Sequence, residues 1–108
     1  MKFLLSSLLL IIYTGAFGQN NYYWVGDAGN WSDLNHWATT SGGTTKYTSL
    51  PTDTDNVFFD ANSFSLASQT VSLDVDAFCN SIDWTGTSNS PHFESLGSSN
   101  QNSLDVHG

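Results

Sequence analysis

The chain has 108 residues, of which ten are acidic and two are Lys, giving a formal net charge of -8. This length allows one small domain at most. The shortage of cations excludes DNA and RNA as partners, because nucleic-acid affinity depends largely on Lys and Arg. Charged residues make up only 11 %, against roughly 25 % in ordinary soluble domains. Aromatic residues make up 14 %, so the chain is too rich in large apolar side chains to be a disordered acidic tail.

Residues 1–18 have the pattern of a secretory signal peptide. Lys2 gives a positive start, residues 3–13 form an apolar run broken only by two Ser, and Ala16-Phe17-Gly18 offers small residues for cleavage before Gln19. The apolar run is about half of the ~20 residues that span a bilayer. We therefore expect a chain that is secreted or displayed at the cell surface, with no transmembrane span after cleavage.

The mature chain is predicted to be all-β. Its apolar residues alternate with polar ones over short runs, and Gly, Ser, Thr, Asn and Asp interrupt the chain every few residues. Val71, Leu73 and Val75, for example, alternate with Ser72 and Asp74. The expected strands cover residues 22–25, 56–60, 70–75, 81–85, 92–96 and 103–107.

The even spacing of these strands suits a β-solenoid or a small β-sandwich, and we favour the solenoid. Strands that become shorter and more uniform toward the C-terminus are expected where an irregular cap gives way to stacked rungs. The predicted organisation is a signal peptide (1–18), an irregular aromatic-rich cap (19–69) and the first rungs of a right-handed β-solenoid (70–108). The pattern is unfinished at Gly108, so we expect a truncated solenoid with downstream domains of a longer chain as partners.

Several motifs in a specific order resemble a known class of protein. They are residues 22–33 (YYWVGDAGNWSD), His36-Trp37, and residues 50–64 (LPTDTDNVFFDANSF), 69–74 (QTVSLD) and 79–86 (CNSIDWTG). Together they resemble the N-terminal region of large secreted, adhesin-like cell-surface proteins of Bacteroidetes, associated with gliding motility and type IX secretion. The resemblance implies a β-solenoid or immunoglobulin-like repeat protein. Related chains often carry a second Cys just before the proline that matches Pro51, where this chain has Ser49 and Leu50.

Four Trp residues invite two interpretations. Trp24, Trp31, Trp37 and Trp84 could form a platform on which the sugar rings of an extracellular glycan stack, and the first three, which lie close together in the sequence, are the candidate ligand residues. The alternative, which we favour, is that these Trp side chains plug the open end of the solenoid, where bulk matters more than regular spacing.

A second candidate site is a calcium site. Asp53, Asp55 and Asn56 follow Pro51 closely and offer the oxygen ligands that Ca²⁺ prefers. Asp and Asn that bond their own backbone in a turn explain the same cluster, and we favour that interpretation. No cofactor is therefore expected, with Ca²⁺ as the alternative.

No catalytic residues are predicted. Glu94 is the only Glu, the His residues are scattered, and Cys79 lies directly before a strand, where a small apolar side chain packs inward. The prediction is therefore a non-enzymatic structural segment of a secreted surface protein. The alternatives are a carbohydrate-binding module with exposed Trp, and the non-catalytic start of a surface enzyme that degrades polysaccharides.

Overall fold

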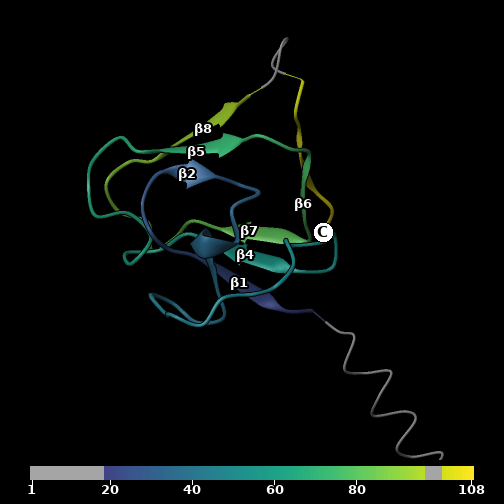
Figure 1. The fold of residues 1–108 in the computed structure, drawn as a ribbon, viewed down its shortest axis with the longest axis horizontal. Helices are drawn as coiled ribbons and strands as arrows, with labels where there is room; N and C mark the ends of the chain where they lie inside the picture. Colours follow the sequence, from purple (N-terminus) through teal and green to yellow (C-terminus); the bar gives the residue numbers. More distant parts are fainter. Residues whose placement is uncertain (1–18, 97–100) are drawn as a thin grey trace, which may run out of the picture.

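The computed structural model describes residues 19–96 and 101–108, and the expected signal peptide lies outside this part of the chain. The described residues are mostly in strands and connecting loops, with one short 3-10 helix (Figure 1). The predicted all-β class is thus confirmed. In chain order the elements are β1 (Asn21–Trp24), β2 (Gly29–Asn30), η1 (Leu34–His36), β3 (Trp37–Ala38), β4 (Asn56–Phe58), β5 (Thr70–Leu73), β6 (Ala77–Cys79), β7 (Ser81–Asp83), β8 (His92–Ser95) and β9 (Leu104–Val106).

The strands form three small sheets, with the orders β3-β1-β4-β7, β2-β5-β8 and β6-β9. All pairs are parallel except β1 with β3. From β4 onward the chain visits the three sheets in the same order twice, first as β4, β5 and β6 and then as β7, β8 and β9. We call each such visit to the three sheets a pass. The second pass lies in register on the first, so that Val57 faces Ile82, Val71 faces Phe93 and Ala77 faces Leu104.

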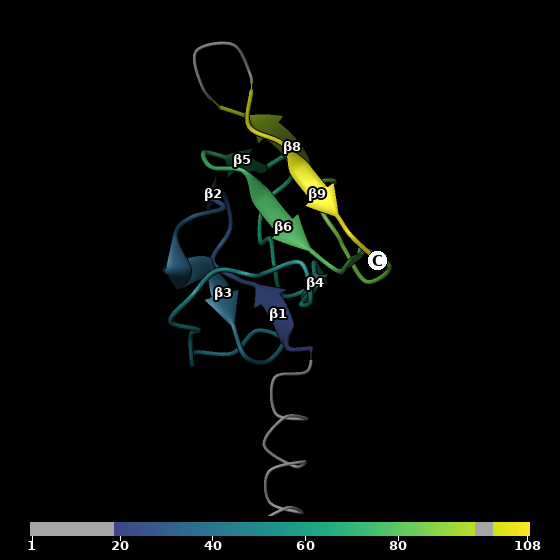
Figure 2. The same cartoon turned by 90° about the vertical axis from the view of Figure 1, so that its right-hand side faces the viewer.

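The region before β4 is less regular. The short strand β3 runs antiparallel along β1 on the side opposite to β4 (Figure 2). The loop that follows β3 returns across this end of the molecule. Tyr47 stacks on Tyr22 with ring centroids 3.7 Å apart, and its hydroxyl donates a hydrogen bond to the carbonyl of Asn21 at 2.7 Å. Burial raises the pKa of both phenols.

The core lies between the three sheets and is made by alternating side chains. Val71 and Leu73 of β5 point inward while Thr70 and Ser72 are partly exposed, which is the two-residue period of a half-buried strand. Aromatic rings supply most of the remaining bulk near the N-terminal end. The buried apolar cluster comprises Tyr22, Trp24, Trp31, Trp37, Val57, Phe59, Phe64, Val71, Leu73, Ala77 and Cys79.

All six expected strands occur, each shorter than expected at its C-terminal end by one or two residues. The chain bends where they end, as at Asp74, whose carboxylate accepts hydrogen bonds from the backbone N–H and the hydroxyl of Ser32. The sequence did not predict β2, β3 or β6. In β6 the small residues Ala77 and Cys79 point inward while Phe78 is 44 % exposed, so the hydrophobic pattern is inverted.

Candidate functional site

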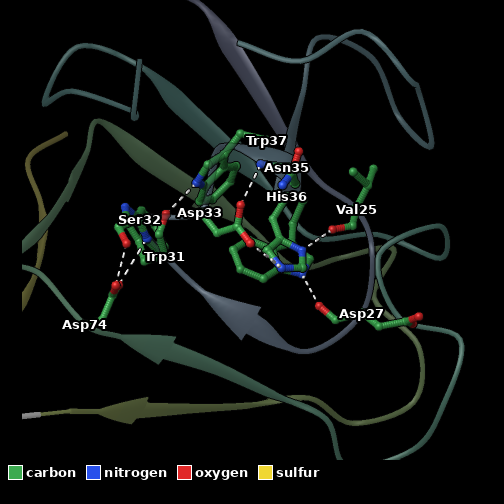
Figure 3. A network of polar contacts seen from close by, with 10 residues as sticks. Val25, Asp27, Trp31, Ser32, Asp33, Asn35, His36, Trp37 and Asp74 are labelled. Carbon is green, nitrogen blue, oxygen red and sulfur yellow. Dashed lines mark hydrogen bonds and ion pairs between the residues drawn. The ribbon is translucent and has the colours of Figure 1, made fainter. Parts of the chain in front are cut away.

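The three Trp residues of the candidate glycan platform lie together in the core. Trp24, Trp31 and Trp37 are 0 %, 1 % and 0 % exposed, so none of them presents a ring face to solvent. Trp37 packs edge-on against both other rings, with centroids 5.0 Å from Trp24 and 4.8 Å from Trp31. The indole N–H of Trp37 donates to the carbonyl of Trp31 at 2.8 Å (Figure 3). The indole N–H of Trp24 donates to the carbonyl of Asp27, also at 2.8 Å, so both indole N–H groups are hydrogen-bonded within the protein.

His36 belongs to the same cluster. Its ring stacks parallel on Trp24 with centroids 4.4 Å apart, and its Nδ1 lies 2.6 Å from the carbonyl oxygen of Val25. Its Nε2 lies 3.8 Å from a carboxylate oxygen of Asp33, the residue that caps η1 by accepting from the N–H of Asn35 (Figure 3). With both ring nitrogens directed at protein groups and the residue buried, His36 is placed to position the turn that carries Trp37.

Gly29 is required by this arrangement. A Cβ atom at position 29 would lie 2.0 Å from Nε2 of His36, which is far inside van der Waals contact. Glycine therefore lets the β2 backbone approach the imidazole ring closely.

The candidate calcium ligands are held in a turn. Asp55 is buried, and its carboxylate accepts from the N–H of Asn20 at 3.1 Å and from the N–H and hydroxyl of Thr52, both at 2.9 Å. The amide of Asn56 bonds to neighbouring strands instead, and Asp53 is exposed. The structure thus gives Asp55 and Asn56 partners within the protein and does not gather the three side chains around a common centre.

Other titratable side chains are dispersed. Among residues 19–96 and 101–108, no group of three or more His, Cys, Asp or Glu residues could hold a metal ion. Every buried side-chain nitrogen or oxygen in this part of the chain has a hydrogen-bond partner. The described core therefore contains no unpaired side-chain nitrogen or oxygen that a ligand would satisfy.

Cys79 lies on β6 with its thiol free and buried. Burial raises the pKa of the thiol to about 11, which keeps it protonated and weakly nucleophilic near neutral pH. This is the inward packing that the sequence indicates, and the arrangement suits a small core residue.

We expect the Cys79 thiol of the folded protein to resist a thiol reagent such as DTNB at pH 8 and to react fully in denaturant. Because folding raises the thiol pKa from about 9 to about 11, the associated stabilisation is complete below pH 9 and is lost as the pH rises toward 11. Urea titrations of wild type and Cys79→Ala between pH 7 and 11 measure this contribution. Rapid labelling of the native protein at pH 8 would show that the thiol is accessible.

Two features that run across the sheets were not predicted. The first, which we call the aromatic column, stacks Trp24, Phe59 and Trp84, with centroid distances of 5.8 and 4.5 Å. The second is a polar ladder in which the amide of Asn56 donates to Oδ1 of Asn21 at 3.2 Å. Oδ1 of Asn56 in turn accepts from the hydroxyl of Ser81 at 2.7 Å and from the amide of Asn80 at 3.0 Å. Both features follow from the parallel register. Their sequence signal is the recurrence of Asn or Ser three residues before an aromatic residue, at Asn21, Asn56 and Ser81.

Comparison with known proteins adds nothing to these observations. In the described part of the chain, no helix has the length and apolar character needed to cross a membrane. No family model, no curated protein and no solved structure matches this chain.

Proposed function

We propose that this chain is a non-enzymatic, structural N-terminal segment of a secreted, adhesin-like cell-surface protein, acting as the cap and first rungs of a right-handed β-solenoid. The observation that carries the proposal is the repeated order of the sheets. Two successive passes, β4–β5–β6 and β7–β8–β9, pair in parallel and in register in all three sheets. In this proposal each pass is a rung.

The register of side chains supports this architecture over a small sandwich. Sandwiches are built from antiparallel strands, whereas here each rung stacks on equivalent positions of the rung before it. The aromatic column and the polar ladder both run across the rungs, as expected of a solenoid whose units bury their apolar faces only on neighbours.

The N-terminal region supports the role of a cap. β3 lies antiparallel on β1 and occupies the edge to which a parallel strand would otherwise add. Trp37 and the stacked pair Tyr22 and Tyr47 cover apolar surface at this end. Covered edges and bulky irregular packing are how repeat proteins protect their ends.

The side chains that could take part in catalysis are placed as structural residues. His36 and Cys79 are buried, and His36 is held by backbone and carboxylate partners. The carbohydrate-binding alternative gains no support from Trp24, Trp31 and Trp37, because their ring faces pack against protein. The alternative of a polysaccharide-degrading enzyme places its chemistry in domains beyond this segment.

Labelling of intact cells tests the proposal. An epitope inserted in the exposed turn at Ser41 and Gly42 should be reached by antibody on intact cells, because this turn lies outside the three sheets. The matched control carries the epitope within β5, between Val71 and Ser72, where it should disrupt the core and abolish display. Labelling of the turn epitope only after permeabilisation would contradict a surface role.

Export should remove the first 18 residues. The positive start, apolar run and small residues before Gln19 predict that the exported protein begins at or near Gln19. Mass spectrometry of the intact exported chain measures this directly. Finding Met1 on the extracellular protein would show that the segment is not a cleaved signal peptide.

A further inference from the structure

The second rung ends in an apolar surface. β7, β8 and β9 are the last strands of their sheets among the described residues, and each is paired on one side only. Their inward side chains are Ile82, Phe93 and Leu104, which are only partly buried, and Trp84 follows β7 with 38 % of its surface exposed. We call these four side chains the end face. In the rung below, the equivalent residues Val57, Val71, Ala77 and Phe59 are at most 1 % exposed.

Trp84 ends the aromatic column. Phe59 lies nearly parallel to it, at an interplanar angle of 16° and a centroid distance of 4.5 Å. Phe93 contacts Trp84 from the side at 5.0 Å and a tilt of 59°. The other Trp side chains are at most 1 % exposed, so Trp84 is the one of the four Trp residues that reports on this surface.

The chain itself shows what covers such a face. The first rung presents Val57, Phe59 and Val71, and the second rung covers them with apolar side chains in parallel register. The backbone pairing of β6 with β9 also continues past β9. The N–H of His107 donates to the carbonyl of Cys79 at 2.8 Å, and the N–H of Gly108 donates to the carbonyl of Asn80 at 2.7 Å. Gly108 thus stands at the position equivalent to Ser81.

We propose that the end face is a docking surface for a further parallel β-rung supplied in cis by a longer chain, with a planar aromatic ring seated on Trp84. The proposal rests on the proposed function and names the chemistry of the partner. The incoming strand over β7 carries an apolar residue over Ile82, a polar residue over Asp83 and an aromatic residue over Trp84. The ring extends the aromatic column by stacking, and the strand satisfies the unpaired backbone groups of β7.

Charge disfavours a second copy of this chain as the occupant. Asp83, Glu94 and Asp105 lie on the three strands that border the end face, and Lys46 is the only Lys or Arg between Gln19 and Gly108. Two copies meeting through their end faces would bring six carboxylates together without cations to compensate them. Like charges held close together oppose association.

A fusion of the chain with its own rung tests the proposal. A copy of residues 82–108 is joined after Gly108, so that the copied β7 continues the register that Gly108 begins. In the copy, Trp84 is replaced by Phe, and Asp83, Glu94 and Asp105 are replaced by Asn, Gln and Asn so that no like charges stack on those of the original chain. The original Trp84 is then the accessible Trp. In the unextended chain acrylamide should quench a fraction of the Trp fluorescence, and this quenchable fraction should fall to near zero in the fusion.

Two matched controls define the contacts. In the first, Asp replaces the copied Trp84, and Trp84 of the original chain should remain quenchable. In the second, one extra residue between Gly108 and the copy shifts the register, which turns the apolar side chains outward and should also leave Trp84 quenchable. Circular dichroism and a thermal melt of each fusion report whether the added residues form strand.

Several results would overturn the proposal. Trp84 that stays quenchable in the Phe fusion shows that no rung docks there, and equal shielding by the Phe and Asp copies shows that no ring is required. Shielding in the unextended chain that rises with concentration identifies a second copy as the occupant, and shielding by soluble polysaccharide identifies a sugar. Surface labelling can fail while the Phe fusion succeeds, so the two proposals are tested separately.

Discussion

Replacing Trp37 by Ala is expected to lower the free energy of unfolding by about 3–5 kcal/mol, the range for deleting a buried aromatic side chain. Trp37 is fully buried and packs edge-on against Tyr22, Trp24, Trp31 and Phe59. Its removal leaves a cavity between rings that cannot close together, and it frees the carbonyl of Trp31 from its hydrogen bond. Urea denaturation of the mature chain, followed by circular dichroism, measures the loss.

Leu66→Ala is the control for this experiment, because Leu66 is 64 % exposed and its truncation should change stability by no more than about 0.5 kcal/mol. A glycan-binding assay on the same variants separates a core role from a sugar platform. A Trp37→Ala protein with unchanged stability and lost glycan binding would contradict the buried position of this ring.

Asp55→Ala is expected to cost at least about 2 kcal/mol of stability, because it leaves several backbone and hydroxyl donors without their acceptor. The carboxylate joins Asn20, which directly precedes β1, to the turn at Thr52, which precedes β4. The residue thereby fixes the start of two neighbouring parallel strands. Asp55→Asn keeps one carbonyl acceptor and should fall between wild type and Asp55→Ala in thermal melts.

Asp53→Ala is the matched control for this turn, since Asp53 is exposed, and it should change stability by no more than about 0.5 kcal/mol. The two aspartates also separate the turn from a calcium site. We expect millimolar Ca²⁺ to leave the melting temperature of wild type unchanged. A rise in melting temperature with Ca²⁺ that disappears in both Asp53→Ala and Asp55→Ala would show that the cluster binds the ion.

The sequence predicted those strands whose inward residues are large and whose outward residues are polar. β5 is the clearest case, because Val71 and Leu73 alternate with Thr70 and Ser72. β6 escaped prediction because its inward residues are the small Ala77 and Cys79 and its outward residue is Phe78, which reverses the expected contrast. β2 consists of Gly29 and Asn30, neither of which favours a strand, and it is set by parallel pairing with Val71 and Ser72.

The sequence indicated which residues could form the candidate sites, but it did not indicate which groups surround them in the fold. That Asp55 bonds within its own turn follows from local chemistry and was anticipated, while its bond to Asn20 depends on the packing of β1 beside β4. The stacking of His36 on Trp24 depends on the close approach that Gly29 allows, which no spacing in the sequence encodes. The sequence did not predict that Trp84 would be the most exposed of the four Trp residues, because exposure depends on how the two passes pack.

The antiparallel strand β3 makes the two outer edges of the four-stranded sheet different from each other. It occupies one outer edge of the four-stranded sheet, whereas β7 occupies the other and pairs with β4 alone among the strands that the structure describes. A contact that repeated head to tail through this sheet would need a parallel strand to add at both outer edges, and such a contact would produce an open-ended filament. Because β3 is antiparallel to β1, it opposes head-to-tail growth of this sheet, and parallel extension of the sheet proceeds from the β7 edge alone.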